Sequence, residues 1–333
     1  MKKYVLEISA GQNNTAGPKA KRDITKILQT NGFNSLKLEL PKSRILKLLF
    51  AKNLIRKMTK NFCKDDIFVM QYPMYSRIGT NLLLNESNKR KVKTICVIHD
   101  VEAIRLYKNN KTKIRQELDS LGRFDCLVVH NDKMKKWLHE HGLNKPMISL
   151  GIFDYLTDQL SPEVSKNLNL VFAGNLGKSK FLEKWKANSK LSLFGIQPSD
   201  NYAHSIEYKG VKNPDELPSF LDGSFGIVWD GNSLETNNGI YGEYTKFNNP
   251  HKVSLYLSCG LPVIVWEKAA VADFIRENNV GLVIKNLNEI DNVLGKVSEE
   301  DYQIMKDNAL TLSTKVRHGF FTTNAINKAI KEI

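Results

Sequence analysis

The chain has 333 residues, of which 41% are hydrophobic and 25% are charged. This length suits two domains of roughly 150 residues each, and this composition excludes a disordered or fibrous protein. No stretch approaches the roughly 18 uninterrupted apolar residues of a membrane span. Glu7 interrupts the apolar start of the chain, so we expect a first strand there rather than a signal peptide, and a cytosolic protein.

The net charge of +14 is divided unevenly between the two halves of the chain. Residues 1–150 contain 30 lysines and arginines against 13 aspartates and glutamates, whereas residues 151–333 contain 19 against 22. The resulting charges of +17 and −3 indicate different tasks for the two halves. A basic domain favours an acidic partner, which leaves nucleic acid, an anionic membrane surface and an acidic acceptor open.

Short β-rich runs alternate with helical stretches along the whole chain, a pattern typical of parallel βαβ units. Several runs, such as Val263–Trp266, are continuously apolar, as strands covered on both faces are. The predicted strands are Tyr4–Ser9, Ser35–Leu40, Ile67–Tyr72, Thr94–His99, Cys126–His130, Met147–Phe153, Leu168–Ala173, Leu191–Phe194, Ile206–Tyr208, Gly226–Trp229, Val263–Trp266 and Leu282–Ile284.

The polar segment Asp154–Asn167 separates the strands into two series. We therefore predict an α/β fold of two Rossmann-like domains, the first over residues 1–155 and the second over residues 156–317. A final helix over about 318–333 is expected to pack back on the first domain.

One predicted helix, Ser43–Lys60, carries apolar and basic residues and no acidic one. Basic amphipathic helices can lie on anionic lipid, so a peripheral membrane contact is one interpretation. The other is an ordinary domain helix with a core face and a solvated basic face.

Two glycine motifs that bind phosphate are incomplete in this sequence. Residues 174–179 end like a P-loop, but Phe172 stands where the motif requires glycine. No GxGxxG follows the first strand, so the usual dinucleotide fingerprint is absent as well. Both observations argue against an NTPase and a dehydrogenase.

A third candidate phosphate site is the start of a predicted helix near residue 250. Asn249 suits the N-cap, Pro250 the first helical position and Gly260 the C-terminal stop. His251 and Lys252 then lie at the positive end of the helix dipole, which costs roughly 0.3–1 kcal/mol per cation. A bound anion would reverse this sign, so we predict a phosphate there, with a solvated lysine as the alternative.

The preceding segment, Asp230–Asn248, is rich in asparagine and glycine and is predicted to be a long functional loop. Its two tyrosines, Tyr241 and Tyr244, could stack on a sugar ring or pack the loop shut.

The run Gly242–Lys252, with Gly260–Ile264 after it, resembles the glucosyltransferase 3 family, bacterial enzymes that extend GlcNAc on serine-rich-repeat adhesins. Galactofuranosyltransferase-like polysaccharide enzymes are similar. The resemblance includes Val97–Val101 and Ala173–Leu176, so it spans most of the chain. It implies a GT-B fold with a cleft between the domains, a UDP-sugar donor in the second domain, an acceptor in the first, and often a homo-oligomer.

On this resemblance, Lys252 and the N–H groups beside it would bind the donor diphosphate. Lys178 or Lys180 could add a second positive charge, because both follow the first strand of the second domain, at the edge where α/β sheets bind ligands. Spacing does not choose between these two lysines. The residues assigned to the donor are Gly17, Lys178, Lys180, Tyr208, Val211, Asn248, Asn249, His251, Lys252 and Val253.

Some of these assignments have structural alternatives. Tyr208 and Val211 would border the base, although Val211 could equally pack in the core. Gly17 would let the backbone approach the donor closely, unless residues 13–19 form a simple strand-to-helix turn. The residues assigned to the acceptor are Thr15, Tyr72, Tyr241 and Tyr244.

His99 and Asp100 end a strongly apolar strand and are the candidate catalytic residues. An inverting transfer needs a base for the acceptor hydroxyl, for which Asp100 is the first choice and His99 the second. Asp100 could instead cap a helix that begins near Val101. The four cysteines form no CxxC pair and no cluster with histidine, and we expect neither a metal nor another cofactor.

The resemblance thus implies an enzyme that moves glucose from UDP-glucose to a GlcNAc-modified Ser/Thr-rich adhesin. One alternative is a galactofuranosyl or other hexosyl transferase of capsule or exopolysaccharide assembly. A second is a basic protein that binds nucleic acid or membrane without catalysis, although no nucleic-acid-binding motif accompanies the charge.

Overall fold

The computed structural model describes residues 1–7, 16–41, 43–74, 76–162 and 169–333, which divide into two compact units. The first unit contains the N-terminal strand, residues 17–150 and residues 321–333; the second contains residues 151–320. The chain thus changes unit after residues 150 and 320, against the sequence-based bounds of 155 and 317.

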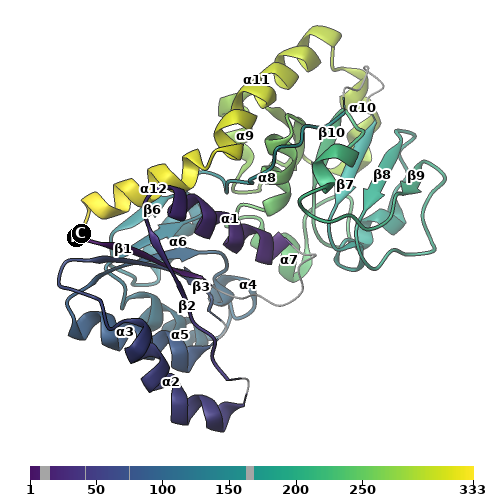
Figure 1. Ribbon diagram of the computed structural model, residues 1–333. Helices are drawn as coiled ribbons and strands as arrows, with labels where there is room; N and C mark the ends of the chain where they lie inside the picture. Colours follow the sequence, from purple (N-terminus) through teal and green to yellow (C-terminus); the bar gives the residue numbers. More distant parts are fainter. Residues whose placement is uncertain (8–15, 42, 75, 163–168) are drawn as a thin grey trace. The chain divides into compact units, whose positions relative to one another are not determined.

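The first unit is a six-stranded parallel sheet in the order β2-β1-β3-β4-β5-β6. Helices α1 and α12 lie over one face, and α2, α3 and α5 lie over the other (Figure 1). The strands are β1 Lys3–Glu7, β2 Asn34–Lys37, β3 Ile67–Tyr72, β4 Lys93–Ile98, β5 Cys126–Val129 and β6 Met147–Ser149. The helices are α1 Ala16–Thr30, α2 Arg44–Met58, α3 Arg77–Lys89, α4 Glu102–Arg105, α5 Lys111–Leu121, α6 Asp132–Glu140 and α12 Phe320–Lys331.

The second unit repeats this plan with the strand order β12-β11-β10-β7-β8-β9, again all parallel. Its strands are β7 Leu170–Ala173, β8 Leu191–Phe194, β9 Ile206–Tyr208, β10 Phe225–Val228, β11 Val263–Trp266 and β12 Gly281–Ile284. Its helices are α7 Gly239–Tyr244, α8 His251–Ser258, α9 Ala272–Asn278, α10 Ile290–Gly295 and α11 Glu299–Arg317, with short 3₁₀ turns at Leu176–Lys178, Lys180–Lys184, Leu217–Phe220 and Leu287–Glu289.

All twelve predicted strands are present, and the continuously apolar ones are buried along their whole length, as β5, β7, β10 and β11 show. A strand covered by helices on both faces has no solvent face to mark with polar residues, which explains this pattern. The segment Asp230–Asn248 differs from its prediction, because α7 lies inside what we expected to be a continuous loop. Among the described residues, no helix is long and apolar enough to span a membrane.

The core of the second unit depends on a close contact between β10 and α8. Gly226 of β10 faces the ring of Tyr256, and a Cβ at residue 226 would lie 2.4 Å from that ring. Tyr256 is fully buried, and its hydroxyl accepts a hydrogen bond of 2.8 Å from the N–H of Ala173 at the end of β7. One tyrosine therefore connects α8 to two neighbouring strands, and only glycine leaves room for its ring.

We predict that Gly226→Ala destabilises the protein by about 1–3 kcal/mol, because the added methyl overpacks the site. Urea unfolding would measure the loss. The matched control is Gly295→Ala in α10, where a Cβ meets no atom within 4 Å. This control should be neutral or slightly stabilising. Equal stability of the two variants would contradict the packing described.

Candidate active site

The second unit presents a lysine–aspartate pair at the carboxyl edge of its sheet. Lys252, in the first turn of α8, places Nζ 2.9 Å from Oδ1 of Asp230, the second residue after β10. Both side chains are 17% exposed, so the pair remains accessible to a ligand. Sequence reasoning missed Asp230, although an aspartate just beyond an apolar strand lies at the edge where α/β sheets bind ligands.

Asp230 changes the electrostatic argument made from the sequence. A lysine at the positive end of a helix is unfavourable by itself, and that conflict suggested an external anion. In the structure, the carboxylate of Asp230 already supplies a negative charge at 2.9 Å. The position of Lys252 therefore does not by itself require a phosphate, and the case for one rests on the surroundings of the pair.

The stem of Lys252 lies against Gly174, the residue after β7. A Cβ at residue 174 would lie 3.0 Å from Cε of Lys252, so a larger residue would push the stem aside. The ammonium group also lies 5.2 Å from the ring centroid of Phe172. The strand end and the helix start thus fix the direction in which Lys252 points.

The start of α8 differs from the prediction by one residue. Pro250 occupies the N-cap position and His251 the first helical position, because the side chain of Asn249 instead donates a 2.7 Å hydrogen bond to the carbonyl of Gly151. Val253 is buried, and its N–H donates to the carbonyl of Pro250 at 3.0 Å. Its N–H is therefore used inside the helix, and the donor role of Val253 stays a prediction.

His251 faces the unit's own aromatic residues. Its ring centroid lies 5.4 Å from that of Phe153 and 5.7 Å from that of Tyr155. The prediction that Gly260 ends the helix is confirmed, since α8 ends at Ser258 and Gly260 adopts φ +72°.

The loops after β7, β8 and β9 meet at the same edge. Gly174 N–H donates to the carbonyl of Phe194, and Gly195 N–H donates to that of Gly210. A Cβ at Gly195 would lie 1.7 Å from the carbonyl oxygen of Gly174, so the two loops approach as closely as backbones can. Tyr208 extends this contact, because its hydroxyl donates to the carbonyl of Gly195 at 2.9 Å.

Val211 lies just beyond β9 and is 48% exposed, so it does not pack in the core.

Asn248 and Asn175 each have a buried side-chain oxygen without a hydrogen-bond partner among the described residues. Buried polar atoms are usually paired, so such atoms are expected where a ligand completes the hydrogen bonding.

The structure separates the two lysines that spacing could not. Lys180 is exposed and pairs with Glu183 at 2.7 Å, and this partner raises its pKa. Lys178 instead lies over the ring of Tyr241, with Nζ 4.3 Å from the centroid. Lys178 therefore lies beside the segment that leads to α8, whereas Lys180 is held by its own 3₁₀ turn.

The two tyrosines of this segment differ in exposure. Tyr241 is 39% exposed and presents its ring beside Lys178. Tyr244 is only 3% exposed, which contradicts its assignment to the acceptor, because its ring packs inside the unit and offers no face to a sugar.

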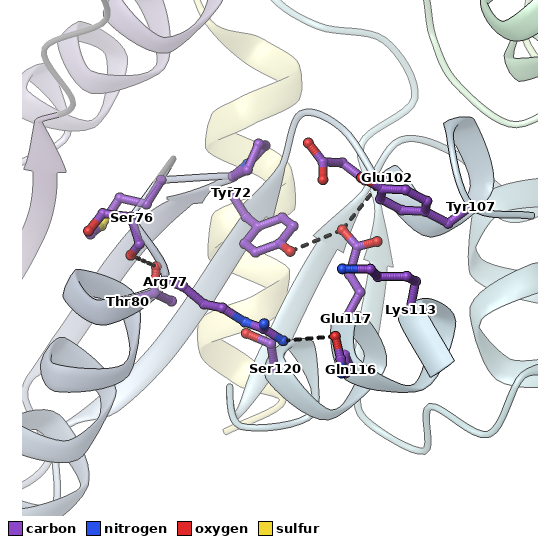
Figure 2. A pocket seen from close by; sticks show the side chains of 12 residues that line it. Tyr72, Ser76, Arg77, Thr80, Glu102, Tyr107, Lys113, Gln116, Glu117 and Ser120 are labelled. Carbon is purple, nitrogen blue, oxygen red and sulfur yellow. Dashed lines mark hydrogen bonds between the residues drawn. The ribbon is translucent and has the colours of Figure 1, made fainter. Parts of the chain in front are cut away.

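A cavity of about 250 Å³ opens in the first unit beyond the end of β3 (Figure 2). Tyr72, at the end of that strand, lines the cavity together with residues of α3, α4 and α5. Its assignment to the acceptor stays a prediction. The volume is slightly below the roughly 300–1,000 Å³ of pockets for drug-sized ligands. The lining residues are Tyr72, Pro73, Met74, Ser76, Arg77, Thr80, Glu102, Tyr107, Lys113, Gln116, Glu117 and Ser120.

Glu117 of α5 organises this cavity. Its carboxylate accepts hydrogen bonds from the N–H groups of Glu102 and Ala103 and from the hydroxyl of Tyr72, the last at 3.0 Å (Figure 2). Burial is the largest influence on this carboxyl and raises its pKa. The start of α4 is therefore capped by a residue from another helix.

This cap overturns the alternative that Asp100 caps the helix. The N-cap residue of α4 is Val101, and Asp100 instead pairs with Arg105 at 3.0 Å. Burial raises the pKa of Asp100, while Arg105 and Lys21 act against this rise. A raised pKa makes the carboxylate of Asp100 a better proton acceptor. The positive charge of Arg105 reduces this rise and therefore makes Asp100 a weaker base.

His99 is oriented by a hydrogen-bond chain from α1. The amide nitrogen of Gln71 donates to the carbonyl of Lys21 and the hydroxyl of Thr25, so its oxygen must accept the 2.8 Å bond from Nε2 of His99. A neutral His99 then carries its proton on Nε2, which leaves Nδ1 as the basic nitrogen.

Of the predicted residues near the N-terminus, Thr15 lies outside the described residues. Gly17 lies in the first turn of α1, and a Cβ there would meet no atom within 4 Å. The close backbone approach and the strand-to-helix turn both remain predictions for Gly17. Among the described residues, no group of three His, Cys, Asp or Glu side chains is placed to hold a metal.

Two units, each built on a six-stranded parallel sheet, define the class of protein. The fold is that of sucrose-phosphate synthase from Thermosynechococcus elongatus, with a TM-score of 0.66 and 11% identity, covering 100% of this chain and 99% of that one. The chain is a glycosyltransferase with the GT-B fold.

It belongs to the glucosyltransferase 3-like family, whose N-terminal domain matches residues 2–152 and whose C-terminal domain matches residues 170–329. It is 31% identical to the β-1,6-galactofuranosyltransferase WbbI of Escherichia coli K12 over 80% of each chain. It is 25% identical to glucosyltransferase 3 of Streptococcus gordonii over 94% of each chain. These relatives confirm the predicted family and replace the alternative of a binding protein without catalysis.

The first-unit site makes a prediction about pH. Lys21 donates a 2.7 Å hydrogen bond to the carbonyl of Pro73, and burial lowers its pKa from 10.5 to about 8, with Asp100 acting in the opposite direction. Between these pH values the unfolded chain binds more protons than the folded one, so Lys21 makes stability rise with pH, by at most about 3 kcal/mol.

Lys21→Met should remove this rise. Urea unfolding of both proteins between pH 7 and 10 would measure it as a difference that changes with pH. A difference that stays constant over this range would contradict the buried position of Lys21.

Proposed function

We propose that this enzyme transfers glucose from UDP-glucose to a GlcNAc-bearing Ser/Thr-rich adhesin. The observation that carries the donor half is Lys252, held against Gly174 at the carboxyl edge of the second sheet. The acceptor half rests on the likeness to glucosyltransferase 3, which covers 94% of the chain.

In this proposal, Lys252 binds the diphosphate and keeps its ion pair with Asp230. An ammonium group has three N–H donors, and Asp230 takes one of them. The other two would bind phosphate oxygens, with the first N–H groups of α8 beside them. Lys178 would add a second charge near Tyr241. Because these groups neutralise the leaving UDP, we expect the reaction to need no bound metal.

The acceptor would enter the first unit at the cavity beside Tyr72. If the reaction inverts, the acceptor oxygen attacks the anomeric carbon, the bond from that carbon to the diphosphate oxygen breaks, and Asp100 takes the hydroxyl proton. His99 is the second candidate for the base.

A second candidate function is galactofuranosyl transfer in polysaccharide assembly. The higher identity to WbbI, 31% against 25%, favours it. A homo-oligomer, which the family resemblance implies, and a cytoplasmic location both remain predictions.

We predict that Lys252→Met lowers UDP affinity and turnover by roughly tenfold to a hundredfold, the effect of losing a charged hydrogen bond. Methionine keeps the apolar stem against Gly174, so the protein should remain folded. Isothermal titration with UDP and initial rates would measure the loss. Lys180→Ala is the matched control, because that lysine is exposed and paired with Glu183. Unchanged turnover of Lys252→Met would refute the phosphate assignment.

Because Lys252 recognises the diphosphate and not the sugar, we expect a donor screen to separate the two candidate functions. UDP release from UDP-glucose, UDP-galactose and UDP-galactofuranose should be fastest with UDP-glucose if the first proposal holds. Preference for UDP-galactofuranose would favour the second, and turnover with none of them would contradict both.

A further inference from the structure

Helix α2 of the first unit exposes a row of large apolar side chains. Ile45 is 70% exposed, Leu49 62% and Phe50 51%, and Leu46 and Leu54 are exposed as well. Single exposed apolar residues are common, but five within ten residues of one helix form a patch. Water-exposed apolar surface on this scale marks a site of interaction.

The patch does not belong to the core face of the helix. Ala51 and Ile55 are fully buried, and this face packs against α3, which also lines the cavity beside Tyr72. The exposed residues form two neighbouring rows with helical i, i+4 spacing, one of Ile45 and Leu49 and one of Leu46, Phe50 and Leu54. α2 thus has one apolar face that the fold uses and a second that it leaves in water.

Basic residues follow the apolar patch along the helix. Lys52, Lys57 and Lys60 are exposed, and Arg56 pairs with Glu86 of α3 at 3.2 Å. Residues 43–60 contain no acidic residue. The exposed apolar residues thus lie between residues 45 and 54, with the half-buried Lys47 among them, and the exposed lysines begin at residue 52.

We propose that α2 docks the first unit onto an anionic lipid surface. The apolar residues would enter the boundary between headgroups and acyl chains, and the lysines would lie among lipid phosphates, as in interfacial amphipathic helices. A second copy of the chain fits less well, because an isologous contact would bring two α2 helices of the same charge together. Nucleic acid would satisfy the lysines but not the exposed leucine and phenylalanine side chains.

Co-sedimentation of the full chain with phosphatidylglycerol–phosphatidylcholine vesicles tests the proposal. Binding should be strong, should weaken with salt, and should be absent with pure phosphatidylcholine. Leu49→Ser/Phe50→Ser and Lys52→Gln/Lys57→Gln should each weaken it at least about tenfold. None of these residues belongs to the donor or acceptor site, so transfer to a soluble acceptor should stay within about twofold.

Matched controls remove comparable surface elsewhere. Leu160→Ser/Ile304→Ser removes two exposed apolar residues of the second unit, and Lys328→Gln/Lys331→Gln removes two charges from α12. Both controls should bind vesicles like the unaltered chain.

Failure to bind anionic vesicles would overturn the proposal, as would equal losses in variants and controls. Binding that falls with Lys52→Gln/Lys57→Gln but not with Leu49→Ser/Phe50→Ser would also overturn it, since charge alone would then explain the attraction. Sedimentation velocity completes the test: a lower mass for Leu49→Ser/Phe50→Ser with unchanged vesicle binding would assign the patch to a second copy.

Discussion

The close contact between Gly174 and the stem of Lys252 is the constraint on which the donor site depends. It leaves room for the stem of Lys252 beside the end of β7, from where the ammonium group reaches Asp230. Tyr256, one turn further along α8, holds the same two elements together by accepting a hydrogen bond from Ala173. The residues that build the core and the residue that would bind phosphate therefore lie on one short helix.

In the first unit, polar groups lie at the end of a buried strand. Glu117 accepts from two backbone N–H groups of α4 and from Tyr72, so it shapes both the helix and the cavity. Asp100 is thereby released from capping and faces Arg105 and Lys21. The lysines of the two units therefore differ in their surroundings. Lys252 is accessible and paired with Asp230, whereas Lys21 is buried and has a lowered pKa.

Sequence reasoning was most accurate where the physical signal was local. The apolar runs predicted all twelve strands, and the family resemblance held over both domains. It was least accurate for partners distant in sequence. Asp230 lies 22 residues before Lys252, and Glu117 lies 15 residues after Glu102. Neither separation matches a known sequence motif, so neither pair could be predicted. Tyr244 was misjudged, and the two roles considered for Val211 could not be separated, for a related reason: burial depends on what packs around a side chain and not on its type.

The sequence by itself determined the two parallel sheets, the class of enzyme and the candidate lysines. Hydrophobic periodicity and motifs depend only on residues that are close together in the sequence. Only the tertiary structure decided which lysine is held by Glu183 and which lies over Tyr241, what caps α4, and which apolar residues of α2 remain in water. These outcomes depend on contacts between segments far apart in the chain, and such contacts exist only once the backbone has folded.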